Sequence, residues 1–184
     1  MTNANILTLS RLVLSLAIFV LLQALPAGPW LFVPFAVLLA AGVTDVFDGL
    51  VARRTNSITE FGRVADAFVD RILICGCYLI FIDWHLVPLW VALVVVVREF
   101  VVGGMRNLAD TRGLRFQATI FGKTKFATQF VACAAVILYR ARFEGVSWAR
   151  LTMDVLVYLS AVNTILSAVA YFANYRRLVG SEQT

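Results

Sequence analysis

Four aspartates are spaced so that their carboxylates could act together on a phosphate-bearing substrate. They belong to the pattern D-x2-D-G-x2-A-R-x8-G-x3-D-x3-D, whose fixed positions are Asp45, Asp48, Gly49, Ala52, Arg53, Gly62, Asp66 and Asp70. On helices, spacings of three and four residues bring each pair of carboxylates onto one face. Carboxylates joined by no histidine or thiolate suit Mg²⁺ or Mn²⁺ rather than zinc. Two such ions could clamp the oxygens of a phosphoryl group during an in-line displacement.

The other fixed positions of this pattern could admit and hold a ligand. Gly49 and Ala52 are small, so a bulky group could approach the helix backbone beside the metals. Gly62 allows tight packing or a sharp turn, and Arg53 offers forked donors that suit phosphate oxygens. Each residue alone also has a structural explanation, because small residues pack membrane helices and an arginine at a helix end sets orientation.

The rest of the chain is apolar enough to place this pattern in a membrane. Hydrophobic residues make up 61% and charged residues 15% of the 184 residues, and the mean hydropathy is +0.85. Apolar runs of about 20 residues, the length that crosses a bilayer, occur at 8–25, 30–49, 65–83, 86–105, 122–140 and 152–173. Backbone groups in lipid must be hydrogen-bonded internally, so these runs predict helices. We expect an all-α, polytopic membrane protein with six transmembrane helices and a single integral-membrane domain, residues 1–184.

Charge and tryptophan positions predict the orientation. Six spans put both termini on the side that holds most loop arginines and lysines, while Arg140, Arg142 and Arg150 lie opposite. This bias places the termini and the acidic pattern in the cytoplasm, at the inner (cytoplasmic) membrane. The tryptophans fall at or near the opposite helix ends, as in an interfacial aromatic belt; they are Trp30, Trp84, Trp90 and Trp148. Orientation and anionic head groups explain the net charge of +5, and no nucleic acid partner is expected.

In this acidic pattern the chain resembles the CDP-alcohol phosphotransferases, whose signature has the same fixed positions. The resemblance implies a six-helix membrane enzyme, usually a homodimer. Such an enzyme transfers a phosphatidyl or related group from a CDP-linked donor to an alcohol and releases CMP. By this resemblance Asp45, Asp48 and Asp66 bind a first Mg²⁺ or Mn²⁺ ion, and Asp45, Asp66 and Asp70 bind a second. The resemblance also makes Asp70 the proposed base.

The same resemblance implies a site for the CDP donor. The residues implied there are Asn5, Thr8, Gly49, Ala52, Arg53, Thr59 and Gly62. Among them, the element Asn5-x2-Thr8-x2-Arg11 is similar to one that in this family lies against the nucleotide-binding region. An alternative is that Asn5 and Thr8 only cap the first helix.

Two further segments resemble the phosphatidylglycerophosphate synthase branch, which joins CDP-diacylglycerol to sn-glycerol 3-phosphate. They are residues 98–106, REFVVGGMR, and residues 122–125, GKTK. Because this acceptor brings its own phosphate, its site needs cations beyond those for the donor. The expected acceptor-phosphate contacts are Arg98, Arg106, Arg115, Lys123 and Lys125, with pairing to Glu99 as the alternative for Arg98. For each of these cations, positive-inside charge is the other explanation.

Departures from the branch pattern leave other acceptors open. Ala67 and Arg71 stand where many phosphatidylglycerophosphate synthases carry proline and lysine, and Ala4 stands where proline is often found. A second hypothesis is another enzyme of the family, such as a cardiolipin synthase using phosphatidylglycerol or an enzyme using inositol phosphate. A third is a divalent-cation transporter whose aspartates line an ion path, but it leaves the small residues and Arg53 unexplained.

Overall fold

The computed structural model describes the backbone of residues 3–55, 60–111 and 120–181, and the side chains of residues 10–44, 68–109 and 124–176. These residues form helices and no strand, so the all-α prediction is confirmed for the described chain. The α-helices are α1 (Asn3–Ala24), α2 (Phe32–Thr55), α3 (Glu60–Asp83), α4 (Leu89–Thr111), α5 (Ile120–Leu138) and α6 (Ser147–Ser181). A short 3-10 helix, η1 (Pro29–Leu31), precedes α2, and a π-helical turn, η2 (Tyr139–Phe143), follows α5.

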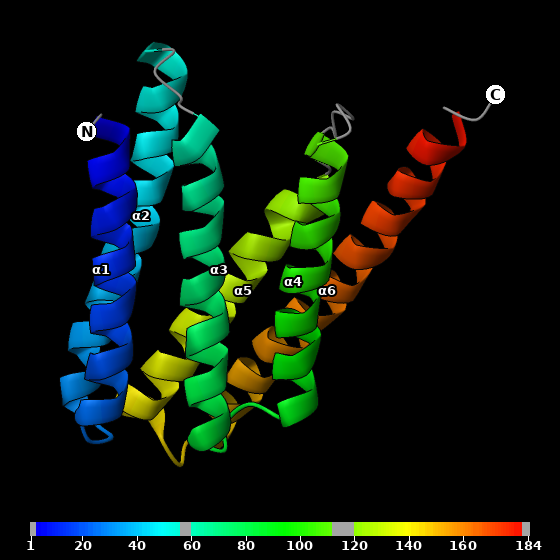
Figure 1. Ribbon diagram of the computed structural model, residues 1–184. Helices are drawn as coiled ribbons and strands as arrows, with labels where there is room; N and C mark the ends of the chain where they lie inside the picture. The colour runs from blue at the N-terminus through cyan, green and yellow to red at the C-terminus, as the bar shows by residue number, and fades with distance from the viewer. Residues whose placement is uncertain (1–2, 56–59, 112–119, 182–184) are drawn as a thin grey trace.

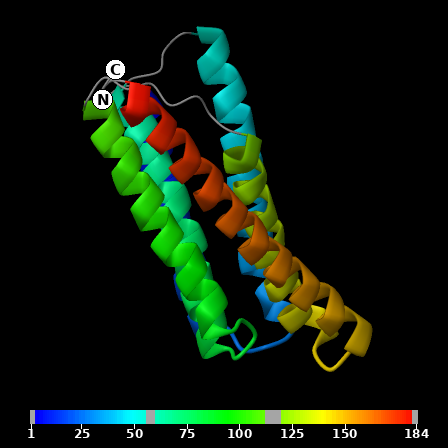
Figure 2. The same cartoon turned by 90° about the vertical axis from the view of Figure 1, so that its right-hand side faces the viewer.

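The helices run alternately up and down, so the connections gather at two ends (Figure 1). We call the end where α2 and α4 finish and α3 and α5 begin the motif end. The other end, formed by residues 25–31, 84–88 and 139–146, is the turn end. Helix α1 packs against α2 and α3, and α6 packs against α4 and α5. In Figure 2, α6 is inclined between the pair α3–α4 and the pair α2–α5.

Helix boundaries differ from the apolar runs at the motif end. Helix α2 continues to Thr55 and α4 to Thr111, beyond the runs that end at residues 49 and 105. Helix α3 begins at Glu60, five residues before its run. Hydropathy marks residues suited to lipid, whereas a helix continues as long as its backbone hydrogen bonds are satisfied. The helical extensions carry parts of the acidic pattern.

Turn chemistry explains why the helices end where they do at the turn end. Gly28 adopts a φ of 116° and Gly145 a φ of 83°, a region that glycine enters without a side-chain clash. Pro29 begins η1, where its missing amide hydrogen costs nothing. His85 is exposed with a φ of 58°, and its Nδ1 lies 2.8 Å from the carbonyl oxygen of Asp83.

Small and polar residues hold the helices together inside the bundle. Tyr78 Oη on α3 lies 2.6 Å from Ser160 Oγ on α6, and Gln129 Nε2 on α5 donates to Thr164 Oγ1 at 3.0 Å. All four of these side chains are buried. In lipid, burying apolar side chains between helices gives no hydrophobic gain, so helices associate through close packing at small residues and through interhelical hydrogen bonds such as these.

Two stretches of the described chain are long and apolar enough to cross a membrane, Thr124–Phe143 and Ser147–Arg176. Shorter apolar stretches occur at Ser10–Ala24 and Pro29–Thr44. Helices α4 and α6 each expose large apolar side chains at helical spacing, among them Leu93, Val97, Phe100, Val155, Val162 and Val169. Apolar faces of this extent mark a surface that meets lipid or another protein.

Gly76 on α3 provides a test of the packing between α1 and α3. A Cβ there would lie 2.8 Å from Cε2 of Phe19, closer than real side chains come. We expect Gly76→Ala to lower the unfolding temperature in detergent, because overpacking costs about 1 to 3 kcal/mol and the helix propensity of alanine returns only about 1. Adding Phe19→Leu should restore the loss. An unchanged unfolding temperature in the single variant would show that the Phe19 ring moves aside at no cost.

Candidate active site

The four aspartates of the pattern divide between two helices that lead to and from the motif end. Asp45 and Asp48 lie in α2, and Asp66 and Asp70 lie in α3. Of these four, Asp70 has a described side chain, and the other three side chains lie outside the described part. The surroundings of Asp70 therefore show what the pattern faces inside the bundle.

Asp70 is half-buried and lines a narrow pocket formed by three other helices. Arg11 and Ser15 contribute from α1, Gly42 from α2, and Phe126 from α5. Gly42 packs tightly there, because a Cβ at this position would lie 2.5 Å from the ring of Phe130. The contact sets how α2 packs against α5 beside the pocket that Asp70 lines.

The other three aspartates lie between this pocket and the motif-end termini of α2 and α3. Asp45 and Asp48 lie one and two turns beyond Gly42 along α2, and Asp66 lies one turn from Asp70 along α3. With 3.6 residues per turn, positions 45 and 48 share a helix face with position 41, which also lines the pocket, and position 66 shares a face with 70. All four aspartate positions thus lie in the halves of α2 and α3 that are nearer the motif end.

The donor chemistry of this region fits a hard divalent cation. The aspartates offer oxygen ligands alone, and the single histidine lies at the turn end. Among the residues with described side chains, no group of three or more His, Cys, Asp or Glu gathers as a metal site. Three of the four predicted ligands are outside that set, so the metal site stays a prediction.

A second group of charges surrounds the buried side chain of Glu99 on α4, and we call it the Glu99 cluster. Its members are Glu99, Arg71, Arg98 and Lys125. Lys125 from α5 forms an ion pair with Glu99 Oε1, and Arg98 Nη1 lies 3.4 Å from both carboxylate oxygens. Arg71 Nε from α3 lies 3.9 Å from Oε2. Among the described residues, one anion therefore faces three cations, which leaves two positive charges in excess.

This cluster is largely removed from water. Glu99 is 4% exposed and Lys125 is 6% exposed. Arg98 also donates from Nη2 to Ser167 Oγ on α6 at 2.6 Å, and its buried Nε has no hydrogen-bond partner among the described residues. An unmet donor beside excess positive charge, in a protein interior, favours binding of an anion with hydrogen-bond acceptors.

The structure brings together some of the predicted acceptor residues. Arg98 and Lys125 meet at Glu99, and the predicted pairing of Arg98 with Glu99 is present. Arg106 is exposed two turns further along α4, close enough to repel Arg98 electrostatically. The other predicted site residues lie outside the part of the chain whose side-chain packing is described. They are Asn5, Thr8, Asp45, Asp48, Gly49, Ala52, Arg53, Thr59, Gly62, Asp66, Arg115 and Lys123.

Two residues have a greater importance in the fold than the sequence indicates. Arg11 is buried and lines the pocket of Asp70, whereas the sequence marks it only as the last position of the N-x2-T-x2-R element. Arg71 reaches the Glu99 cluster, whereas in the sequence it is only a departure from the branch pattern. The signal for both is an arginine inside an apolar helix, since such a charge requires a partner.

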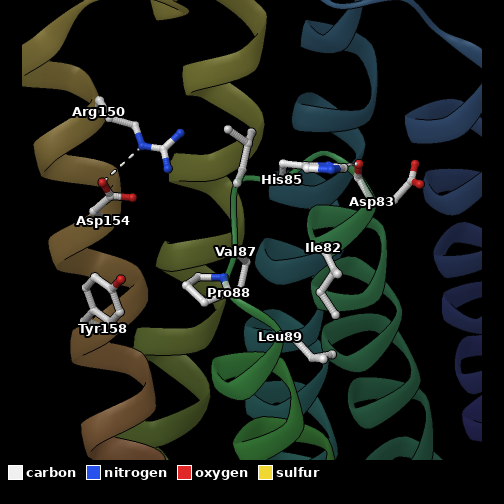
Figure 3. Close-up of a pocket in the computed structure, with 10 residues that line it drawn as sticks. Ile82, Asp83, His85, Val87, Pro88, Leu89, Arg150, Asp154 and Tyr158 are labelled. Atoms are coloured by element: carbon white, nitrogen blue, oxygen red, sulfur yellow. Dashed lines mark hydrogen bonds and ion pairs between the residues drawn. The ribbon is translucent and has the colours of Figure 1, made fainter.

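A wider pocket of about 520 Å³ opens at the turn end, the end of the bundle opposite the aspartate positions (Figure 3). Its wall includes His85, Arg150, Asp154 and Tyr158. Arg150 Nε donates to Asp154 Oδ2 at 3.1 Å, so these charges already satisfy each other. None of the predicted site residues lines this pocket, and we place the candidate site at the motif end.

Comparisons with known proteins identify the family of the chain. A family model for CDP-alcohol phosphatidyltransferase matches residues 1–173. The chain is similar to proteins named CDP-diacylglycerol--glycerol-3-phosphate 3-phosphatidyltransferase. The relative from Escherichia coli (strain K12) is 31% identical, covering 94% of this chain and 93% of the relative. The one from Bacillus subtilis (strain 168) is 32% identical, covering 73% and 69%. Because the match extends over nearly the whole chain, the protein belongs to the CDP-alcohol phosphatidyltransferase family.

Proposed function

We propose that the protein transfers the phosphatidyl group of CDP-diacylglycerol to sn-glycerol 3-phosphate, yielding phosphatidylglycerophosphate and CMP. The Glu99 cluster is the observation that carries the choice of acceptor, because its excess positive charge suits an alcohol that already bears a phosphate. The names of the relatives support the same donor and acceptor.

In this reaction the chain's own residues bind the acceptor and move one proton. Arg98 and Lys125, joined by Arg106, Arg115 and Lys123, hold the acceptor phosphate. The primary hydroxyl oxygen of the acceptor forms a bond to the phosphatidyl phosphorus, and the bond from that phosphorus to the CMP oxygen breaks. CMP leaves with the bonding electrons, and the hydroxyl proton passes to the Asp70 carboxylate.

Two Mg²⁺ or Mn²⁺ ions would be held by the aspartates, the first by Asp45, Asp48 and Asp66 and the second by Asp45, Asp66 and Asp70. When bound, such ions neutralise phosphate charge and orient the reacting oxygens. The CDP donor is expected at Asn5, Thr8, Gly49, Ala52, Arg53, Thr59 and Gly62.

We also propose that all six helices span a bilayer, as a single integral-membrane domain in the inner membrane that works as a homodimer. The apolar faces of α4 and α6 support contact with lipid. Tryptophans in η1, in the α3–α4 turn and at the starts of α4 and α6 support an interface at the turn end. The motif end then faces the cytoplasm.

The acceptor is tested by CMP release from purified protein in detergent with CDP-diacylglycerol and Mg²⁺ or Mn²⁺. We expect release with glycerol 3-phosphate and none with phosphatidylglycerol or inositol phosphate. An Asp66→Asn variant should be inactive. Release with only one of the other acceptors would overturn the branch while keeping the family chemistry. Metal flux into vesicles without CMP release would favour the transporter hypothesis instead.

A further inference from the structure

Arg71 follows the proposed base directly in the chain but points to a different part of the molecule. Asp70 lines the pocket shared with α1, α2 and α5, whereas Arg71 reaches Glu99 on α4. Its guanidinium also lies over the ring of Phe68, 5.8 Å from the ring centroid. A single turn of α3 therefore supplies both the proposed base and a member of the Glu99 cluster.

A missing side chain on α4 makes this reach possible. A Cβ at Gly103 would lie 2.8 Å from Cζ of Arg71 and closer still to Nη1. Any side chain at 103 would thus displace the guanidinium from the surface of α4. A Cβ at the adjacent Gly104, in contrast, would meet nothing within 4 Å.

Arg71 keeps hydrogen-bonding capacity after it pairs with Glu99. The 3.9 Å separation of Nε and Oε2 is an ion pair but too long for a hydrogen bond. A guanidinium carries five N–H donors in a planar fork that matches phosphate oxygens. Arg71 is about a quarter exposed, the most accessible of the three cations on Glu99. It can thus turn donors toward a ligand that enters the cluster.

We propose that Arg71 is a specificity-determining contact to the phosphate of the acceptor, and that Glu99 and Gly103 are the positioning residues that hold its guanidinium there. This inference rests on the proposed function. A phosphate monoester carries a charge of about −1.5 to −2 at neutral pH, which balances the two excess positive charges of the cluster. The diphosphate of the CDP donor offers similar oxygens, so the experiment must separate the two substrates.

The two substrates can be distinguished by steady-state kinetics. CMP release from the full-length protein in detergent is measured while one substrate is varied and the other is saturating. We expect Arg71→Gln to raise the KM for glycerol 3-phosphate by about tenfold or more, the loss typical of a hydrogen bond to a charged group. The KM for CDP-diacylglycerol should stay close to that of the wild type. Arg71→Lys should recover part of the loss, since it keeps the charge without the fork.

Gly103→Ala and Gly104→Ala form the matched pair of variants. They make the same change at neighbouring positions of one helix, and both gain the helix propensity of alanine. Gly103→Ala should raise the KM for glycerol 3-phosphate without a comparable fall in kcat, while Gly104→Ala should leave both unchanged. Because Gly103→Ala moves only the far end of Arg71, it leaves the backbone beside Asp70 in place.

The inference is overturned if Gly103→Ala and Gly104→Ala behave alike, or if Arg71→Gln raises only the KM for CDP-diacylglycerol or lowers only kcat. A wild type that releases no CMP with glycerol 3-phosphate would instead overturn the proposed function. In that case, thermal unfolding with added inorganic phosphate tests whether Arg71 binds phosphate at all. Stabilisation that is lost in Arg71→Gln and kept in Gly104→Ala supports a phosphate site at Arg71, and equal stabilisation in both variants rejects it.

Discussion

Replacing Asp70 with Asn is expected to lower CMP release by about 10²- to 10⁴-fold, the range that a positioned general base contributes. The amide keeps the size of the side chain but neither accepts the proton nor carries the charge that a metal ion requires. Asp70 lines the pocket with Arg11 and Gly42, one turn from Asp66. The measurement is CMP release with both substrates saturating and with unfolding temperature recorded for each protein.

Asp154→Asn is the matched control for this variant. Asp154 lies at the turn end, where its charge pairs with Arg150, so activity should change little. An equal loss in both variants would point to a general effect of removing an aspartate. Full turnover in Asp70→Asn would exclude Asp70 both as base and as ligand.

Metal dependence separates the two roles of Asp70. A carboxylate beside cations becomes more acidic and therefore a weaker base. If Asp70 acts mainly as a ligand, raising the Mn²⁺ concentration should recover part of the activity of Asp70→Asn. If it acts as the base, activity should stay low at every metal concentration.

Replacing Glu99 with Gln is expected to have the largest effect on stability. The change leaves Arg71, Arg98 and Lys125 without their shared buried anion, and breaking a buried pair in this way typically costs about 3 to 5 kcal/mol. For a chain of this size we expect the unfolding temperature to fall by on the order of 10 °C. The measurement is thermal unfolding in detergent at fixed salt.

Glu144→Gln supplies the matched control, since Glu144 is exposed at the turn end. An unchanged unfolding temperature in Glu99→Gln would mean that water already compensates the three cations.

The helices can be predicted from hydropathy because each apolar run is long and several of the runs end in turn residues. Gly28, Pro29 and Pro88 indicate two of the turns by residue type alone, and both turns are present in the fold. The extension of α2 to Thr55 cannot be predicted in this way. Residues 50–55 include two arginines, and hydropathy alone does not distinguish a polar helical turn from a loop.

The candidate site can be predicted only in part, because its charges meet through packing between helices. Arg98 and Glu99 are neighbours in sequence, so their pairing is predictable. Lys125 reaches Glu99 from 26 residues away, and this contact depends on how α4 and α5 each pack against α6. Arg71 reaches the same carboxylate only because residue 103 is glycine, a steric condition that neither hydropathy nor spacing reveals.

The turn end links segments that are distant in sequence. The amide of Gly28 donates to the carbonyl oxygen of Arg140 at 3.2 Å, and the guanidinium of Arg140 lies over the ring of Trp84 at 4.4 Å. Trp90 also stacks on Tyr158, joining α4 to α6. These contacts join the connections that follow α1, α3 and α5 to one another, and they do so at the end of the bundle opposite the aspartate positions.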